Sequence, residues 1–437
     1  MDSIQQQNLQ TLDALGSQVT QKIAELQRLL DKHDIPQPSF APNICDNIDQ
    51  TPDSKLEIIP VKTALVEAAR QIYVLALGPR EYLNQVTLAD KYDAAVMRAI
   101  LVFEIDKAVP INGEASYAEI SKKCDLAERE VKRFVKFAIT NYIFYEHRKG
   151  YVSHSAVSAL WATDADERNW ALHNIRDVYL STISFNDALS RPGFKGSDET
   201  NKTPRNILYG DSTDVFQYMS SDTQRWNAFH GAMRASKKFD TFSTSHVTEW
   251  SGWKKLPEGA SVVDIGGSYG HVSKAIALAH PHLKFCVQDL PSVVSDAHKS
   301  LEPELADRIS FSAYDFFSGP QPETADVYLL RWVLHDWPDK YAAKILRNTI
   351  ATMKPGSRIL LVDVILPEPN TVPKYKEKSA RATDLQMYAF VGAIERDVDM
   401  WRELIAKVDS RLEIVDIQRP SLGGHGILEV KLNEGTL

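Results

Sequence analysis

From about residue 255 onward, short β-rich segments alternate with helical stretches, and this alternation constrains the fold more than any other feature. The β-rich segments are Ser261–Ile265, Lys284–Gln288, Ile309–Ala313, Val327–Leu330, Ile359–Val364, Leu412–Ile417 and Ile427–Lys431. Helical stretches separate the first five, and parallel neighbours in a sheet need crossovers of that length. The pattern therefore predicts a doubly wound, mainly parallel α/β domain over residues 251–437.

The chain ahead of that domain is predicted to begin with an arm, residues 1–58, made of one amphipathic helix and a Pro-rich linker. Apolar side chains at spacings of three and four form a single stripe on this helix. They are Leu12, Leu15, Val19, Ile23, Leu26 and Leu30. Because a lone helix is marginal in water, the stripe must pack against a partner subunit or against the same chain. The sequence leaves both possibilities open.

Residues 59–165 are predicted to form a winged helix. Ser116 and Glu119 have the spacing of a capping box, which opens a short helix ending near Cys124. A second helix follows over residues 127–140, and β-rich stretches then flank the turn at Lys149 and Gly150. Residues 166–250 are predicted to be a helical connector that contributes to a substrate pocket.

The composition is that of a soluble globular protein. The 437 residues are 43% hydrophobic and 25% charged, and 50 basic against 58 acidic residues give a net charge of −8. No apolar run approaches the roughly 18 residues of a membrane span, and residues 1–7 lack the features of a secretory signal. Three widely spaced cysteines argue against a disulfide framework. We therefore expect a cytoplasmic protein that binds neither membranes nor nucleic acid.

A glycine-rich turn follows the first predicted strand. Gly266, Gly267 and Gly270 stand between that strand and a helix, where glycines let the backbone approach a ligand closely. The spacing departs from the common dinucleotide pattern because it leaves less room for a pyrophosphate. Taken alone, the turn could also be purely structural.

Acidic residues end the next two predicted strands. Asp289 stands where a carboxylate can accept both hydroxyls of a ribose. Asp315, beside Phe316, can accept an exocyclic amine next to an aromatic face. Either acid could instead cap the helix that follows it. Together, the turn and the two acids predict a site for a cofactor that contains a purine nucleoside.

The fourth predicted strand runs into a histidine, His335, between Trp332 and Trp337. It lies at the edge where such sheets bind ligands, and an ordinary pKa of about 6.5 suits a proton acceptor. A loop histidine packed on the two tryptophans is the alternative. Asp363, inside an apolar strand, and Glu395, after a later helix, favour catalysis because either could orient the imidazole. Glu395 could instead be a surface residue.

Together these residues resemble a class I S-adenosylmethionine-dependent O-methyltransferase of the two-domain plant caffeic-acid type, in its fungal secondary-metabolite variant. The resemblance covers about residues 60–437. It is carried by Asp264-Ile265-Gly266-Gly267, Asp289-Leu290-Pro291, Asp315-Phe316-Phe317, Leu330 to Trp337, Ile365-Leu366-Pro367 and Glu395-Arg396. It implies an α/β fold in which a Rossmann-like doubly wound catalytic domain follows an all-helical winged-helix dimerisation domain, and hence a homodimer.

The resemblance also implies roles for the site residues. S-adenosylmethionine would contact Gly266, Gly267, Gly270, Asp289, Leu290, Asp315, Phe316 and Arg331. His335 would take the proton of the acceptor hydroxyl, with Asp363 and Glu395 beside it. A pocket for a flat aromatic acceptor is expected from Phe229, Met233, Trp332, Met387 and Tyr388. The implied reaction moves a methyl group to a phenolic or enolic hydroxyl of a small aromatic or polyketide-type natural product.

Three other functions are weaker interpretations of the same sequence. The fold could use the cofactor's sulfonium electrostatically in pericyclic or dehydration chemistry, although His335 with two flanking carboxylates favours methyl transfer. A Mg²⁺-dependent catechol-type enzyme would need an Asp/Asn cluster at ligand spacing beside His335. The sequence has no such cluster there, so no metal is expected. DNA binding by the winged helix is disfavoured because Glu128 and Glu130 would repel phosphate.

Overall fold

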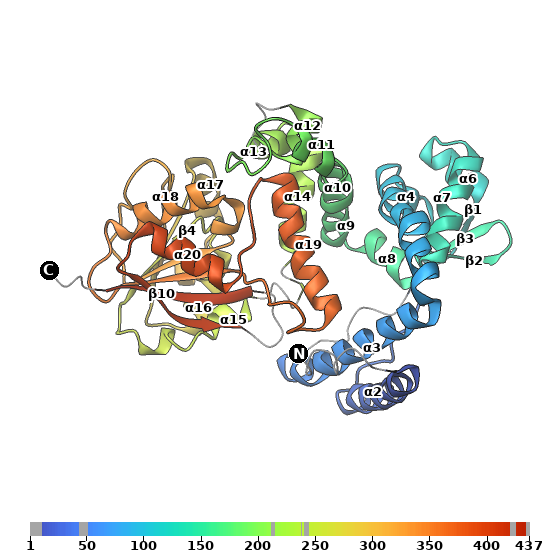
Figure 1. The fold of residues 1–437 in the computed structure, drawn as a ribbon, viewed down its shortest axis with the longest axis horizontal. Coiled ribbons are helices and arrows are strands. Elements are labelled where there is room, and N and C mark those ends of the chain that lie inside the picture. The colour runs from blue at the N-terminus through green and yellow to red at the C-terminus, as the bar shows by residue number, and fades with distance from the viewer. Residues whose placement is uncertain are drawn as a thin grey trace. The chain divides into compact units, whose positions relative to one another are not determined.

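A computed structural model describes residues 11–42, 51–210, 215–236, 238–239, 244–419 and 425–433 (Figure 1). The chain divides into two compact units. The first holds Met1–Leu180, Met219–Ala235 and Pro373–Lys376, and the second holds Ser181–Tyr218, Ser236–Val372 and Glu377–Leu437. The four-part division at 1–58, 59–165, 166–250 and 251–437 stays a prediction. Part of the expected linker, 43–50 with Cys45, lies outside the described residues.

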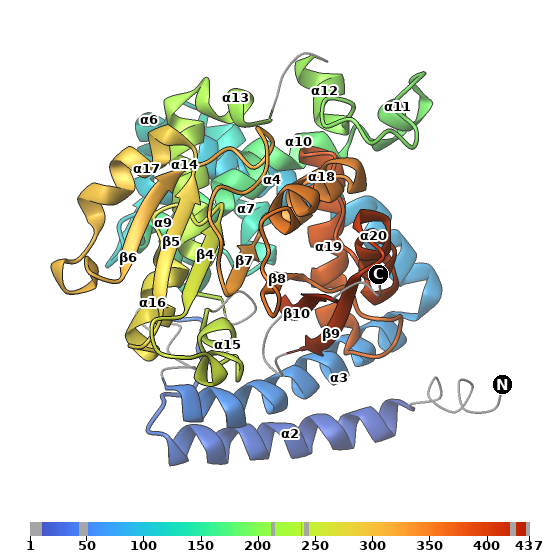
Figure 2. The same cartoon turned by 90° about the vertical axis from the view of Figure 1, so that its left-hand side faces the viewer.

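The first unit opens with two helices that pack along each other, α2 (Leu12–Lys32) and α3 (Pro52–Asn84) (Figure 2). Leu29 and Leu30 of α2 form a buried cluster with Ile58 and Val61 of α3. The stripe predicted on the first helix is thus covered, at this end, by the same chain. Helix α3 contains a kink at Gly78, whose φ of 72° is outside the helical region.

Further helices and one small sheet complete the first unit. The helical segments are η1 (Gln85–Ala89), α4 (Lys91–Val102), α5 (Ile105–Ala108), α6 (Tyr117–Cys124), α7 (Glu128–Thr140), α8 (Ala156–Thr163), α9 (Ala165–Leu172), η2 (His173–Val178), α10 (Tyr179–Thr182) and α14 (Thr223–Ser236). The capping box predicted for α6 is confirmed, since Ser116 accepts a bond from the Glu119 N–H and Glu119 accepts one from the Ser116 N–H. Strands β1 (Glu114–Ser116), β3 (Tyr151–His154) and β2 (Phe144–Arg148) pair in that order, antiparallel. The N-terminal region is therefore helical apart from this sheet.

One buried ion pair ties α5 to α9 in the first unit. The Asp106 side chain is 0% exposed and accepts bonds from Arg168 Nε at 2.7 Å and from Arg168 Nη2 at 3.3 Å. Arg168 Nη2 also donates to the Leu101 carbonyl at 2.7 Å. Both charges therefore have partners, as buried charges require.

The second unit is built on a seven-stranded sheet whose order is β6-β5-β4-β7-β8-β10-β9 (Figure 2). Its strands are β4 (Ser261–Ile265), β5 (Lys284–Asp289), β6 (Ile309–Ala313), β7 (Val327–Arg331), β8 (Arg358–Val364), β9 (Leu412–Gln418) and β10 (His425–Leu432). The first five are parallel, whereas β10 pairs antiparallel with both β8 and β9. The predicted mainly parallel sheet is confirmed.

Helices cover both faces of this sheet, which makes it doubly wound. One buried cluster joins a face to α18 (Asp339–Ile350) and α20 (Val398–Val408), and a second joins the other face to α15 (Ser245–Thr248), α16 (His271–Ala279) and α17 (Pro291–Ala297). The remaining helical segments are α11 (Phe185–Ser190), α12 (Pro204–Tyr209), α13 (Val215–Ser220), η4 (Trp253–Lys255), η5 (His298–Ser300), η6 (Pro303–Leu305), η7 (Leu334–Asp336) and α19 (Lys374–Phe390). Within the described ranges, no helix has the length and apolarity that a bilayer crossing requires.

The strand order fixes where a ligand can bind. The chain runs outward from β4 to β5 and β6, then returns to the other side of β4 with β7 and β8. At such a reversal, the connections after adjacent strands leave in opposite directions and open a crevice at the carboxyl ends. The predicted site residues at the ends of β4, β5 and β7 all belong to this edge.

Candidate active site

The glycine turn after β4 leaves no room for side chains. A Cβ on Gly267 would lie 2.6 Å from Asp264 Cγ and 2.7 Å from Val287 Cγ1. Gly266 and Gly270 have φ of 70° and 71°, a region that favours glycine. Main-chain N–H groups of Gly266 and Gly267 donate to the Gln288 carbonyl on β5 at 2.8 and 3.0 Å. The turn is therefore bare backbone held against the neighbouring strand.

Asp289 is held at the end of β5 by two main-chain donors. Its carboxylate accepts bonds from the Ser268 N–H at 2.9 Å and the Leu290 N–H at 2.8 Å. Burial raises the pKa of Asp289, and these two bonds oppose the rise. The carboxylate therefore has a fixed direction beside the glycine turn, with lone pairs left for further donors. Leu290 is exposed next to it.

Asp315 and Phe316 follow β6. The exposed Asp315 accepts a bond from the Phe317 N–H at 2.8 Å, which stabilises a local turn. The Phe316 ring lies near the glycine turn, because its Cε1 would be 4.0 Å from a Cβ on Gly266. Asn348 of α18 donates to the Phe316 carbonyl at 2.8 Å. The Phe316 ring thus stands beside the glycine turn, and the Asp315 carboxylate precedes it in the chain.

The chain leaves β7 in an unusual conformation. Arg331 is the last residue of the strand, and its guanidinium lies 4.2 Å from the centroid of the Trp332 ring. Trp332 has a φ of 56°, which is rare for a bulky side chain and marks stored backbone strain. The short turn η7 follows directly and carries His335. The strained residue therefore sets the direction in which the histidine is presented.

Three carboxylates surround His335. Its Nδ1 lies 3.0 Å from Glu395 Oε1, and its Nε2 lies 3.6 Å from Asp336 Oδ1. Burial would lower the pKa of His335, but the negative charges of Glu395, Asp336 and Asp363 outweigh it and raise the pKa to about 10. The imidazole is therefore a strong proton acceptor whose protonated form the site stabilises.

Asp363 is confirmed as a buried charge near the end of β8. It is 0% exposed, and neither carboxylate oxygen has a hydrogen-bond partner among the described residues. Burial raises its pKa to about 7, and the neighbouring His335 opposes that rise. Glu395, 1% exposed, likewise has one oxygen without a partner in the described part of the chain. Buried, under-satisfied acids of this kind cost stability and are typical of functional sites.

Glu395 is held in place by its own main chain and its neighbours. Asp384 of α19 accepts a bond from the Glu395 N–H at 3.0 Å. The adjacent Arg396, 0% exposed, donates to the carbonyls of Leu334 and Trp337, which bracket His335, at 3.1 and 2.9 Å. The alternative of a surface position for Glu395 is wrong, because the segment pairs with the end of β8.

The sequence interpretation missed three of these contacts. Asp336 adjoins His335 and could have been found from that adjacency. Arg396 belongs to a quoted motif, but its contacts come from tertiary structure. By local propensity Asp339 would cap α18, yet the N-cap is Pro338 and Asp339 instead pairs with Arg396 at 2.9 Å. The buried Arg396 thus binds the carboxylate that helix-capping propensity predicts for the N-cap.

The five predicted pocket residues fall in different units. Phe229 and Met233 lie on α14 in the first unit, where the Phe229 ring packs against His173 at 5.5 Å. Met387 is buried on α19 in the second unit, and Tyr388 packs against Phe185 at 5.5 Å between ring centroids. A pocket that joins the two sets with Trp332 stays a prediction.

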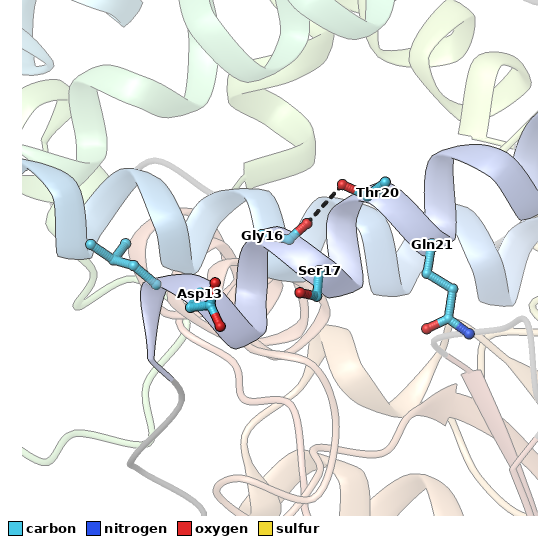
Figure 3. Close-up of a pocket in the computed structure, with 6 residues that line it drawn as sticks. Asp13, Gly16, Ser17, Thr20 and Gln21 are labelled. Carbon is cyan, nitrogen blue, oxygen red and sulfur yellow. Dashed lines mark hydrogen bonds between the residues drawn. The ribbon is translucent and has the colours of Figure 1, made fainter.

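A separate hollow of about 630 Å³ lies along α2, lined by Leu12, Asp13, Gly16, Ser17, Thr20 and Gln21 (Figure 3). It holds none of the predicted site residues, and its drawn hydrogen bond joins the Thr20 hydroxyl to the Gly16 carbonyl. In the described part of the chain, no three His, Cys, Asp or Glu side chains are grouped as a metal site.

A glycine turn, strand-end acids and a histidine among carboxylates at the carboxyl edge of a doubly wound sheet are the arrangement expected of a class I methyltransferase fold. The O-methyltransferase domain family matches residues 196–409. O-methyltransferase pgmB of Aspergillus terreus is 34% identical over 97% of this chain and 96% of its own length, and O-methyltransferase bik3 of Gibberella fujikuroi is 31% identical over 97% and 93%. The chain belongs to the S-adenosylmethionine-dependent O-methyltransferase family.

Solved structures agree on the fold. The crystal structure of OxaC superposes with a TM-score of 0.72 at 22% identity, covering 96% of this chain and all of that one (100%). LepI in complex with SAM superposes with a TM-score of 0.69 at 20% identity, covering 96% of this chain and 100% of its own, and a related structure is described as a pericyclic reaction enzyme. Because the same fold serves both chemistries, the residues of the site must decide between them.

Proposed function

We propose that this enzyme methylates a phenolic or enolic hydroxyl of a small aromatic or polyketide-type natural product, with His335 as general base. The observation that carries the proposal is the contact of 3.0 Å between His335 Nδ1 and Glu395 Oε1, at the carboxyl edge of the sheet. It directs Nε2 toward the acceptor and stabilises the imidazolium that forms. A pericyclic enzyme has less use for that arrangement.

The acid–base chemistry of His335 fits a phenol. A phenol has a pKa of about 10 and is a poor nucleophile at neutral pH until its proton is removed. The carboxylates raise the pKa of His335 to about 10, so proton transfer between the two groups is nearly balanced in energy. His335 must be neutral before it accepts the proton, so we expect the rate to rise with pH.

The residues of the crevice fit S-adenosylmethionine. The turn at Gly266, Gly267 and Gly270 offers backbone that no side chain can cover, and Asp289 offers a fixed carboxylate. We assign Asp289 and Leu290 to the ribose, Asp315 and Phe316 to the adenine, and Arg331 to the cofactor's neighbourhood. When bound, the cofactor supplies a methyl group on a sulfonium. Asp363, Glu395 and Trp332 would hold the imidazole and exclude water from it.

We further propose that the enzyme is a cytoplasmic homodimer formed through a winged-helix domain in the N-terminal region. Large apolar side chains are exposed along α3, η1 and α4, among them Leu75, Leu83, Leu88 and Tyr92. Exposed apolar side chains gathered in one region are typical of protein interfaces. Leu83→Glu with Leu88→Glu should convert a dimer to a monomer in light scattering, whereas Ile183→Glu, at another exposed apolar position, should not.

The function is tested by incubating the purified protein with methyl-labelled S-adenosylmethionine and a panel of phenols and enols, followed by mass spectrometry. One labelled methyl on an acceptor oxygen supports the proposal. Transfer to carbon or nitrogen alone, or an unlabelled rearranged product, would exclude it. His335→Asn should lose the reaction, and His282→Asn, a histidine that binds the Trp253 carbonyl ahead of β5, should keep it.

A further inference from the structure

Trp332 occupies a conformation that needs external support. Its φ of 56° is unfavourable for an L-residue with a large side chain, and such strain persists only where surrounding contacts hold it. Its main-chain N–H donates to the Val362 carbonyl on β8 at 3.2 Å. Its indole lies roughly parallel to the His335 imidazole, with centroids 6.2 Å apart and planes at 29°. The side chain is thus part of the wall beside the base.

The indole is fixed by a residue far away in the sequence. Trp332 Nε1 donates a hydrogen bond of 2.6 Å to Nε2 of His425, the first residue of β10. His425 is 1% exposed and lies opposite Val364 in the β8–β10 pairing, next to the pair that contains Asp363. Strand β10 lies beside β8 (Figure 2), and its first residue therefore brings an acceptor to Trp332.

His425 suits the role of acceptor. An imidazole nitrogen accepts a bond only in the neutral ring, so this contact requires His425 to be neutral with its proton on Nδ1. Burial lowers the pKa of His425 well below its ordinary value, and the positive charges of Arg331, His246 and His335 lower it further. The two histidines near Trp332 thus differ, since His335 attracts a proton and His425 does not.

We propose that His425 is a positioning residue for acceptor recognition: through the hydrogen bond to Trp332 it holds the indole plane beside His335, where a flat acceptor ring is bound. The inference rests on the proposed function and deepens it. It assigns to β10 a part in selecting flat, aromatic acceptors. Most residues assigned to the cofactor lie at the ends of β4, β5 and β6, on other strands than this bond.

Three variants of the full-length enzyme test the inference. His425→Leu removes the acceptor at similar volume, His425→Gln offers an amide oxygen at similar reach, and Trp332→Phe removes the donor but keeps a ring. We expect His425→Leu and Trp332→Phe each to raise the acceptor KM about tenfold, a loss of about 1.4 kcal/mol. The double variant should be no worse than Trp332→Phe, since both changes remove one bond.

Calorimetry should give an S-adenosylmethionine Kd unchanged within about twofold in the two His425 variants. His425→Gln should recover most of the lost acceptor affinity, and His282→Gln should leave all constants unchanged. Additive losses, equal losses in His425→Gln and His425→Leu, or an unchanged KM in Trp332→Phe would each overturn the inference. If His425→Leu does not fold, Trp332→Phe and His425→Gln still decide it. A parent enzyme that transfers no methyl group to any phenol or enol would instead overturn the proposed function, and parent-level transfer in His335→Ala would overturn only the role of His335 as base.

Discussion

Two buried carboxylates, both 0% exposed, are treated in opposite ways by this protein. In the first unit both carboxylate oxygens of Asp106 accept hydrogen bonds from Nε and Nη2 of Arg168, and Nη2 also donates to the Leu101 carbonyl. Asp363 in the second unit has no hydrogen bond to either oxygen among the described residues, although His335 and Glu395 affect its titration. The first cluster, Asp106 with Arg168, therefore has its hydrogen bonds satisfied, whereas the second cluster, Asp363 with His335 and Glu395, does not.

The comparison teaches that burial of a charge does not by itself mark a site. A paired carboxylate contributes to structure, because its desolvation is offset by its partners. A carboxylate without hydrogen-bond partners beside a titratable base lowers stability and is typical of a functional site. If this distinction is correct, changes at the first cluster should alter folding and changes at the second should alter chemistry.

The largest effect is expected at the base itself. His335→Ala removes the proton acceptor, and general-base catalysis is worth about 10²–10⁴-fold, so kcat should fall by that factor. Binding of S-adenosylmethionine, measured by calorimetry, should persist. A loss of less than about tenfold would mean that another group accepts the proton.

The next effect should appear only in stability. Asp106→Ala leaves the Arg168 guanidinium buried without its carboxylate, which costs about 3–5 kcal/mol of unfolding free energy. Urea unfolding would measure this loss. Turnover per folded molecule should match that of the parent. A change in kcat with intact folding would contradict a purely structural role for Asp106.

A smaller effect is expected in the pH profile of Glu395→Gln. The carboxylates raise the pKa of His335, so the neutral, active base appears only as pH rises. Removing the Glu395 charge should lower that pKa and move the rising limb of kcat to lower pH, while the plateau falls because the imidazolium is less stabilised. An unmoved or alkaline-shifted limb would contradict the role given to Glu395.

The smallest effect is expected in the stability of Asp363→Asn. Burial raises the pKa of Asp363 to about 7, so the folded protein binds its proton more tightly than the unfolded chain does. That carboxylate therefore weakens folding as pH rises from about 4 to about 7. Urea titrations at several pH values should show the stability of the variant, relative to the parent, rising over that interval. The kcat of the variant should be lower than that of the parent. If the relative stability of the variant fell over that interval, Asp363 would not destabilise the fold in the way described here.

Much of the catalytic unit could be predicted from the sequence because its signals are local. Each strand of the parallel sheet is a short apolar run, and the residues at its carboxyl end share one edge. His335 and Asp363 were accordingly expected at the same edge, and the structure brings them near one another.

The remainder depends on contacts between distant segments. Nothing near His425 in the sequence indicates that it will meet Trp332, since their bond depends on β10 lying beside β8. The positive φ of Trp332 has no signature, because glycine or asparagine is the usual residue there. Asp339 is a further example, because local propensity predicts a helix cap, whereas its side chain pairs with the distant Arg396.

The position of β10 has a consequence for how the enzyme is made. This strand lies between β8 and β9 in the sheet, although it is the last of the seven to leave the ribosome. Until it arrives, β8 has an open edge and β9 has no neighbour, so the nascent sheet is exposed to wrong pairings. Because the same strand carries His425, an incompletely synthesised chain would lack both its final sheet contacts and the support of Trp332.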